Sequence, residues 1–383
     1  MTSGPRTVLV VVGTRPEAIK MAPVVTALRA FEPRIAVKIA LTGQHTDLVD
    51  RALGALSLEP DYDLGIMKEG QTLYDVVHGT LDGLGDVVRH LGPDVVLVQG
   101  DTATVFTASL VGYFEHVRVG HVEAGLRSGN KWSPFPEEVF RRLTDVLADY
   151  HFAPTEGARA HLEREGVPRD TIHVTGNTVV DALHRSAERP HTVADERLRA
   201  LLDDDTARLI LLTAHRRESF GEPLRRIFGA VRALADRVED AHVVFPVHPN
   251  PAVVGAAHDM LSDHPRIHLL EPLGYLDIVA AMRGASLVLT DSGGIQEEAP
   301  AFGVPVLVLR EVTERPEGID AGVAELVGTD PDRILAASVA ALSDMRGTPR
   351  PNPYGDGRAG ERIADILAAD LLGQPRRTED WDG

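Results

Sequence analysis

The sequence predicts an α/β protein built from two doubly wound, Rossmann-like domains. Short apolar runs alternate with helical patterns along the chain, which is typical of parallel sheets with right-handed crossovers. The runs are apolar throughout rather than alternating, as expected for strands covered on both faces. A polar segment, residues 187–206, separates two such series, and 383 residues suffice for two domains with full cores.

The expected strands are residues 8–12, 37–42, 95–99, 117–121, 151–153, 209–213, 242–246, 267–269, 287–290 and 306–309. Helical patterns lie between them, for example at residues 17–29 and 224–235. The boundary is expected near Gly176, which gives an N-terminal domain of residues 1–175 and a C-terminal domain of residues 176–359. The amphipathic stretch 360–373 is expected to pack back on the body of the protein, and the polar tail 374–383 to be disordered.

Composition and charge narrow the classes of function. The formal net charge of −18 argues against general binding to nucleic acid or to anionic membranes. The absence of cysteine excludes disulfides, thiolate metal sites and a cysteine nucleophile, and it fits a cytoplasmic location. The apolar run at residues 7–12 is far too short to span a bilayer. Only Arg6 precedes that run and no cleavage site follows it, so neither a membrane anchor nor a secretory signal is expected.

Ligands of open parallel sheets bind beyond the carboxyl ends of the strands, so the polar residues that follow each strand carry most of the functional information. The run 287–290 leads into Ser292, Gly293 and Gly294, which suit the start of a helix that a ligand can approach closely. Free amides there favour an anion such as a diphosphate, and Glu298, one turn on, could reach ribose hydroxyls. The alternative is an ordinary helix start.

The first strand leads into a second candidate anion site. Gly13 permits a tight turn, and Pro16 suits the first helical position. Arg15 and Lys20 share this helix start, where the arginine could bind a phosphate through two parallel hydrogen bonds. A plain strand–helix turn is the alternative. Further basic pairs beside strand ends are Arg216 with Arg217 and Arg310 with Arg315, although solvated surface charge is the usual fate of such residues.

Carboxylates follow the middle strands of the first half. Asp101 is well placed as a helix N-cap, which is the simplest interpretation. Glu123 ends an apolar strand before a glycine, where a carboxylate rarely helps folding, so a functional role is favoured. Glu137 and Glu138 open a helix, where acids favour the macrodipole. One of them could instead join Asp101 and Glu123, and neighbouring carboxylates would separate their pKa values as acid–base chemistry requires.

Histidines mark the second half. His215 follows a strand and could exchange protons near neutral pH, whereas His242 is expected to be structural. No tight spacing of histidines and carboxylates supports a metal site. One Gly-x-Gly-x-x-Gly occurs at residues 355–360, but no strand precedes it and too little chain follows for a βαβ unit. It is therefore rejected as a dinucleotide fingerprint.

Taken together, these motifs resemble the non-hydrolysing UDP-N-acetylglucosamine 2-epimerases, from the first strand to about Gly360. The matching stretches are residues 13–20, 100–102, 121–127, 133–138, 176–183, 215–220, 291–300, 313–317 and 352–357. The resemblance implies the glycosyltransferase-B architecture, with an active site in the interdomain cleft and a C-terminal helix that crosses back to the first domain. It also implies a homodimer, a UDP-sugar substrate and no cofactor.

The resemblance also implies roles for individual residues. The catalytic positions are Asp101, Glu123, Glu137 and His215, with Arg141 close by. The positions that contact UDP in the family are Arg15, Ser292, Gly293, Glu298 and Arg315. Lys20 and Gly294 are further candidates for substrate binding, because they lie at the same two helix starts. The chain departs from the family pattern at Phe140, at Thr46 and Asp47, and at Gly70. Gln44 and Gln71 keep part of a second, regulatory substrate site that some relatives have.

The chemistry explains why a 2-epimerase would need these residue types. The proton on C2 of the sugar is not acidic, because no carbonyl lies next to it, and oxidation would need a nicotinamide for which no credible site exists. The remaining route expels UDP while a base removes that proton, and then adds both back. A hydrolysing 2-epimerase, a glycosyltransferase of the same architecture and a non-catalytic nucleotide-sugar sensor are the alternatives.

Overall fold

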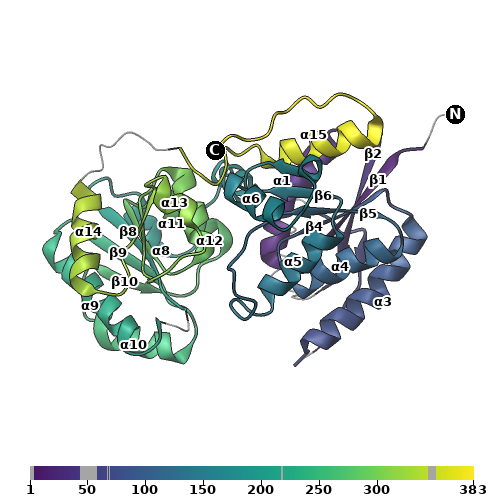
Figure 1. Ribbon diagram of the computed structural model, residues 1–383. Coiled ribbons are helices and arrows are strands. Elements are labelled where there is room, and N and C mark those ends of the chain that lie inside the picture. The colour runs from purple at the N-terminus through teal and green to yellow at the C-terminus, as the bar shows by residue number, and fades with distance from the viewer. Residues whose placement is uncertain (1–3, 44–57, 67, 69, 217–218, 344–350) are drawn as a thin grey trace. The chain divides into compact units, whose positions relative to one another are not determined.

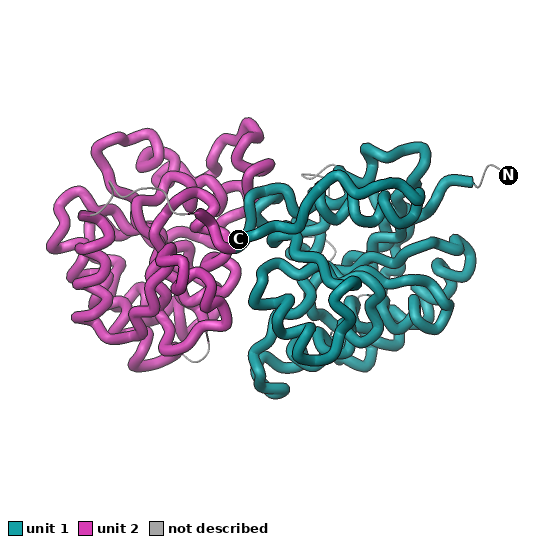
Figure 2. Tube along the Cα trace, turned by 45° about the horizontal axis from the view of Figure 1, so that its top comes forward, with its two compact units in different colours: residues 1–182, 354–383 teal, residues 183–353 magenta. Residues whose placement is uncertain are grey.

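The computed structural model describes residues 4–43, 58–66, 68, 70–216, 219–343 and 351–383. They form two compact units (Figure 2): Met1–Ala182 with Tyr354–Gly383 make unit 1, and Leu183–Pro353 make unit 2. The chain therefore passes between the units a few residues after Gly176, and again at Pro353. Helix α7 (Thr178–Ala187) runs across the first division.

In unit 1 the described residues form a seven-stranded parallel sheet in the order β3-β2-β1-β4-β5-β6-β7. Its strands are β1 (Arg6–Val12), β2 (Ile35–Leu41), β3 (Tyr62–Asp63), β4 (Val95–Gln99), β5 (Arg118–Val122), β6 (Tyr150–Ala153) and β7 (Ile172–Val174). Alternate residues of β1 face two separate apolar clusters, with Val8 and Val10 in one and Leu9 and Val11 in the other. The central strands are therefore covered on both faces, which is why they are apolar throughout.

Helices cover both faces of this sheet (Figure 1). They are α1 (Arg15–Arg29), α3 (Leu73–Leu91), α4 (Ala103–Phe114), α5 (Glu137–Leu147), α6 (Glu156–Arg164) and α15 (Ala359–Leu372), with a 3₁₀ turn at Arg169–Thr171. Helix α15 lies along α1, so the end of the chain packs on the N-terminal half. The approach is close because Gly360 has no side chain: a Cβ there would lie 2.8 Å from the carbonyl carbon of Pro23.

In unit 2 the described residues form a six-stranded parallel sheet in the order β10-β9-β8-β11-β12-β13. Its strands are β8 (Arg208–Thr213), β9 (Ala241–Pro246), β10 (Ile267–Leu270), β11 (Leu287–Thr290), β12 (Val306–Val308) and β13 (Ala324–Leu326). Its helices are α8 (Glu196–Leu202), α9 (Glu222–Arg237), α10 (Pro251–Leu261), α11 (Tyr275–Gly284), α12 (Gly293–Glu298), α13 (Pro316–Asp320) and α14 (Pro331–Ser343), with a 3₁₀ turn at Ala299–Phe302. The two sheets confirm the predicted α/β class with two Rossmann-like domains.

All ten predicted strands occur, whereas β3, β7 and β13 were not predicted. Each of these three is only two or three residues long and lies at an edge of its sheet. Such short segments carry too little apolar pattern to be distinguished from loops.

The C-terminal tail is not disordered, so that prediction was wrong. Trp381 is buried, and its amide donates to the carbonyl of Val174 on the edge strand β7. The Asp380 carboxylate accepts from the Val174 amide at 3.1 Å. The Asp365 carboxylate on α15 accepts from the amides of Arg377 and Thr378, at 2.7 Å each. The prediction of disorder rested on the polar composition of the tail. It was wrong because one buried aromatic ring and the hydrogen bonds to β7 and α15 hold this polar segment in place.

Among the described residues, no helix combines the length and apolar character that a bilayer crossing requires.

Candidate active site

The carboxyl ends of β1, β4 and β5 bring predicted site residues of unit 1 into contact. The Lys20 ammonium on α1 donates to Glu123 Oε2 at 2.6 Å. The Arg141 guanidinium on α5 donates to the carboxylate of Asp101. Asp101 is not the helix cap that the sequence suggested: Thr102 caps α4, and its hydroxyl accepts from the Val105 amide. The Asp101 side chain therefore faces α5 and its arginine.

Glu123 occupies an unusual backbone conformation directly after β5. Its φ of +69° lies in the left-handed region, which side chains with a Cβ rarely adopt. The side chain is almost fully buried, and its Oε2 accepts from the Lys20 ammonium and from the side-chain amide of Gln99. Strain of this kind persists only where the surroundings fix it, and it is concentrated at functional sites. The structure thus places a buried, charge-paired carboxylate at this strand end.

The two glutamates that open α5 have different surroundings. The Glu138 carboxylate accepts from the amides of Ser128 and Gly129 at 2.9 and 3.3 Å, so it holds the preceding loop. Glu137 Oε2 is buried and has no hydrogen-bond partner among the described residues, and the same is true of Arg141 Nε. Glu137 and Arg141 are four residues apart and so share one face of the helix. Of the two acids, Glu137 is therefore the one available for chemistry.

Glu17 belongs to this region, although no role was predicted for it. Its carboxylate accepts from the Gly13 amide at 2.6 Å and from the Thr102 hydroxyl at 2.9 Å. It thereby joins the loop after β1 to the loop after β4, next to Asp101. Burial raises the pKa of Glu17 to about 7, against the opposing effect of its hydrogen bonds. The capping pattern Thr14-x-x-Glu17 was visible in the sequence, but it predicts a helix start and not a buried acid.

In unit 2, a buried carboxylate organises the loop after β8. Asp291 follows β11, is fully buried, and accepts from the amides of His215 and Arg216 through Oδ2 at 2.8 Å each. The His215 ring stacks on His248, with ring centroids 5.2 Å apart and planes inclined by 10°. Neither Asp291 nor His248 was assigned a role from the sequence. The sequence signal that could have found them is their position within two residues of the end of a strand, as is also true of His215.

The residues predicted to bind the diphosphate in unit 2 lie together at the start of α12. Ser292 occupies the N-cap position, as its residue type suggests, but its side chain makes no capping hydrogen bond among the described residues. Arg315 lies over this helix start, since a Cβ on Gly293 would be 3.4 Å from its guanidinium carbon. A Cβ on Gly294 would lie 3.4 Å from the Glu298 carboxylate, so Glu298 turns back toward the same helix start. The Arg315 Nε donates to Glu297 at 2.7 Å, which fixes the guanidinium in place.

The remaining predicted site residues either lie away from these two groups or fall outside the residues that the structure describes. Arg15 is the first residue of α1, beside its cap Thr14. Gln71 precedes α3, and its Oε1 accepts from the Lys68 amide at 3.0 Å. Gln44 and Arg217 lie outside the described residues. The structure therefore does not test whether Gln44 and Gln71 form a regulatory site. Within the described part of the chain, no group of three or more metal-binding side chains comes together.

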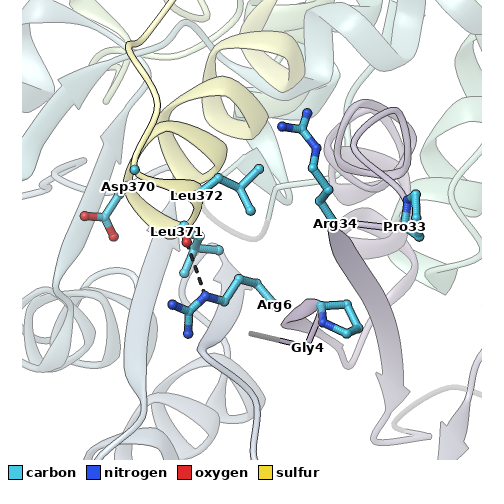
Figure 3. A pocket seen from close by; sticks show the side chains of 9 residues that line it. Gly4, Arg6, Pro33, Arg34, Asp370, Leu371 and Leu372 are labelled. Carbon is cyan, nitrogen blue, oxygen red and sulfur yellow. Dashed lines mark hydrogen bonds between the residues drawn. The ribbon is translucent and has the colours of Figure 1, made fainter. Parts of the chain in front are cut away.

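The cavity in Figure 3 is unrelated to these residues. It has a volume of about 680 Å³ and lies at the amino ends of β1 and β2, beside the end of α15. Arg6 on its wall already donates to the carbonyl of Leu371 at 3.2 Å and to Asp94 at 2.9 Å. Ligands of parallel sheets bind at the opposite, carboxyl ends of the strands. We therefore assign this cavity no part in the site.

Two α/β units with parallel sheets, each carrying charged residues at its strand ends, define a two-domain protein of the glycosyltransferase-B type. A sequence model of the family described as UDP-N-acetylglucosamine 2-epimerase matches residues 27–368. The chain belongs to this UDP-N-acetylglucosamine 2-epimerase family.

Individual relatives agree with this assignment. The UDP-N-acetylglucosamine 2-epimerase of Bacillus subtilis is 47% identical over 94% of this chain and 94% of its own length. The S. aureus protein MnaA, solved with UDP, is 43% identical, covers 98% of this chain with all of its own, and has a TM-score of 0.86. The Neisseria meningitidis UDP-GlcNAc 2-epimerase, solved with UDP-GlcNAc, is 42% identical over 96% of this chain and 100% of its own, with a TM-score of 0.83.

Proposed function

We propose that this protein reversibly converts UDP-N-acetylglucosamine to UDP-N-acetylmannosamine without net hydrolysis. The observation that carries the proposal is the group of carboxylates in unit 1: the charge-paired Glu123, Asp101 bonded to Arg141, and Glu137, whose Oε2 has no hydrogen-bond partner among the residues that the structure describes. The relatives solved with UDP and with UDP-GlcNAc support the choice of substrate.

The proposed reaction proceeds by elimination and re-addition. The bond between C1 and the UDP oxygen breaks while a base takes the proton from C2, which leaves a glycal and UDP. UDP then adds back to C1, and a proton is delivered to C2 from the opposite face. The atoms balance with no oxidant, and two proton-transfer groups of different protonation state are required.

Each unit supplies part of this chemistry in the proposal. Asp101, Glu123, Glu137 and His215 transfer protons and stabilise the positive charge that develops on the sugar ring. Arg15, Arg315 and the helix start at Ser292, Gly293 and Gly294 bind the diphosphate, and Glu298 binds the ribose. Lys20 acts through Glu123, because its ammonium is bonded to that carboxylate and holds it in place.

Incubation with UDP-N-acetylglucosamine in heavy water tests the reaction. Proton NMR should show UDP-N-acetylmannosamine accumulating, with deuterium at C2 of the product. An unlabelled product would exclude elimination. Release of free N-acetylmannosamine and UDP as the main products would instead identify a hydrolysing 2-epimerase. Absence of any turnover would favour a nucleotide-sugar sensor.

We also propose a homodimer, in which an exposed apolar face on α4 and α5 is buried. Tyr113 and Phe114 at the end of α4 are 62% and 59% exposed, and Val146 on the adjacent α5 is 80% exposed. Large apolar side chains that gather on one surface commonly mark an interface. Light scattering should give twice the chain mass for the wild type and a monomer for Val146→Glu. Val312→Glu, at an exposed position of unit 2, is the matched control and should remain a dimer.

A further inference from the structure

His121 is a buried histidine with no assigned role in the proposed reaction. It lies on β5, two residues before Glu123, and its side chain is fully buried. Its Nδ1 lies 2.6 Å from Asp145 Oδ1, and its Nε2 lies 2.8 Å from the carbonyl oxygen of Gly100. Gly100 directly precedes Asp101. The ring therefore connects α5 to the loop that carries a candidate catalytic acid.

Both partners of the ring can only accept hydrogen bonds. A carboxylate oxygen faces one ring nitrogen and a backbone carbonyl faces the other, so both bonds form only when each nitrogen carries a proton. A neutral ring would leave one acceptor facing a lone pair in a buried site. The geometry thus favours a positively charged His121 paired with the Asp145 carboxylate.

The surrounding charges are consistent with this pair. Asp145 Oδ2 accepts from Arg127 at 2.6 Å, and Arg127 in turn binds Glu165 at the end of α6 at 2.8 Å. Burial raises the pKa of Asp145, but the positive His121 and Arg127 outweigh that effect and hold the pKa below its usual range. On the neighbouring β6, His151 Nε2 contacts the backbone carbonyl of Asp145 at 2.8 Å.

The His121–Asp145 pair links helix α5 to the candidate active site. Glu137, Arg141 and Asp145 are spaced by four residues and so lie on one face of the helix. Arg141 binds the Asp101 side chain, while Asp145 binds, through His121, the carbonyl of the residue before Asp101. The loop is thus tied to α5 at two points one helical turn apart. His121 lies on β5, and Glu123 directly follows that strand.

We propose that doubly protonated His121 is a positioning residue that holds the Gly100–Asp101 loop against the Glu137–Arg141 face of α5. It acts through Asp101, whose loop it binds at the Gly100 carbonyl. The activity readout of this inference rests on the proposed function.

Steady-state kinetics of His121→Gln test the effect on the reaction. We expect kcat to fall at least about tenfold while KM changes less than about twofold, because misplaced acid and base groups slow chemistry more than binding. His151→Gln is the matched control: a buried histidine on the adjacent strand whose Nε2 contacts the backbone carbonyl of Asp145 and whose Nδ1 contacts the Thr171 hydroxyl. It should keep kcat within about twofold. A His121→Gln enzyme with wild-type kcat would overturn the inference.

A double-mutant cycle separates positioning from general stability. His121→Gln and Arg141→Lys should be strongly non-additive in kcat, because both alter the same loop, whereas His151→Gln and Arg141→Lys should be additive. Equal coupling in the two cycles would contradict a specific positioning role.

Nitrogen NMR of the wild-type protein tests the protonation state without any enzyme assay and without a variant that must fold. Two ring N–H signals of His121 are expected between pH 6 and 8, assigned through their bonds to Asp145 and Gly100. A single N–H signal in that range would refute the inference. If the wild type turns over no UDP-sugar but shows both signals, the proposed function fails and the charged pair stands.

Discussion

Glu17 and Glu123 are both buried carboxyls of unit 1 but differ in their surroundings. Glu123 accepts from a lysine and an amide, so its charge is compensated. The hydrogen bonds to Glu17 come from uncharged groups, the Gly13 and Thr14 amides and the Thr102 hydroxyl, and burial dominates its titration. A buried acid with a raised pKa and a charge-paired carboxylate at the end of one sheet differ in the way that proton transfer in both directions requires.

Glu17 should make stability depend on pH. Its pKa rises from 4.5 in the unfolded chain to about 7 in the folded protein. The folded state therefore binds more protons, and the contribution is fully present below pH 4.5 and is lost as the pH rises through about 7. The loss amounts to roughly 3 kcal/mol. Denaturant unfolding of wild type and Glu17→Gln across pH 4.5–8 should show this slope only in the wild type; parallel curves would contradict it.

Asp101→Asn should abolish turnover and spare UDP binding. Loss of a proton-transfer group costs on the order of 10²–10⁴-fold in kcat. The proposed UDP contacts at α12 and Arg315 lie on unit 2 and the remaining one, Arg15, lies on α1, and none of them is altered. Calorimetric titration with UDP should therefore give a near wild-type Kd. Asp94→Asn, which changes an aspartate at the amino ends of the strands, is the control and should stay active. A variant of Asp101 with more than a tenth of wild-type kcat would remove it from the mechanism.

At the scale of elements, the contact between α1 and α15 depends on one glycine. Helix α15 supplies Ile363 and Leu367 to the same apolar cluster as α1 and β1. Its first turn is held by Asp181, whose carboxylate accepts from the amides of Ala359 and Gly360 at 3.1 and 2.8 Å. Helix α15 is thus attached to unit 1 by hydrogen bonds at its first turn and by apolar packing along its length.

Gly360→Ala should destabilise unit 1. The new Cβ would approach backbone atoms of Pro23 within 2.9 Å, so one helix must move. We expect a loss of about 1–3 kcal/mol in the free energy of unfolding, as for other overpacked sites. Gly229→Ala on α9 is the matched control, since its Cβ would meet nothing within 4 Å, and it should gain about 0.5–1 kcal/mol. Equal effects of the two changes would show that α15 does not press on α1.

At the scale of the whole molecule, both ends of the chain belong to the same unit. Residues that follow unit 2 return to unit 1, where Arg362 binds Asp356 through two contacts of 2.7 Å and the tail continues to the edge strand β7. The tail covers backbone groups of an edge strand that would otherwise be free to pair with another chain.

Removal of residues 374–383 should therefore weaken unit 1. Burial of Trp381 alone contributes roughly 2–3 kcal/mol. Fluorescence provides the readout, because the other tryptophan, Trp132, is 68% exposed and emits as a solvated indole. Trp381→Phe should shift the emission maximum to the red and the truncated protein should unfold at lower denaturant. An unchanged spectrum would show that the tail does not dock.

Apolar runs and the polar residues that follow them are local patterns, so they were enough to predict the two parallel sheets and the strand ends at which Asp101, Glu123, His215 and Ser292 lie. Which of these groups come into contact depends on how separate elements pack. That Asp101 binds Arg141 rather than capping α4, that Glu138 holds the preceding loop, and that Glu17 is buried against the loop after β4 follow from contacts between separate elements. The docked tail has the same origin, since the surface that buries Trp381 exists only once β7 and α15 are in place.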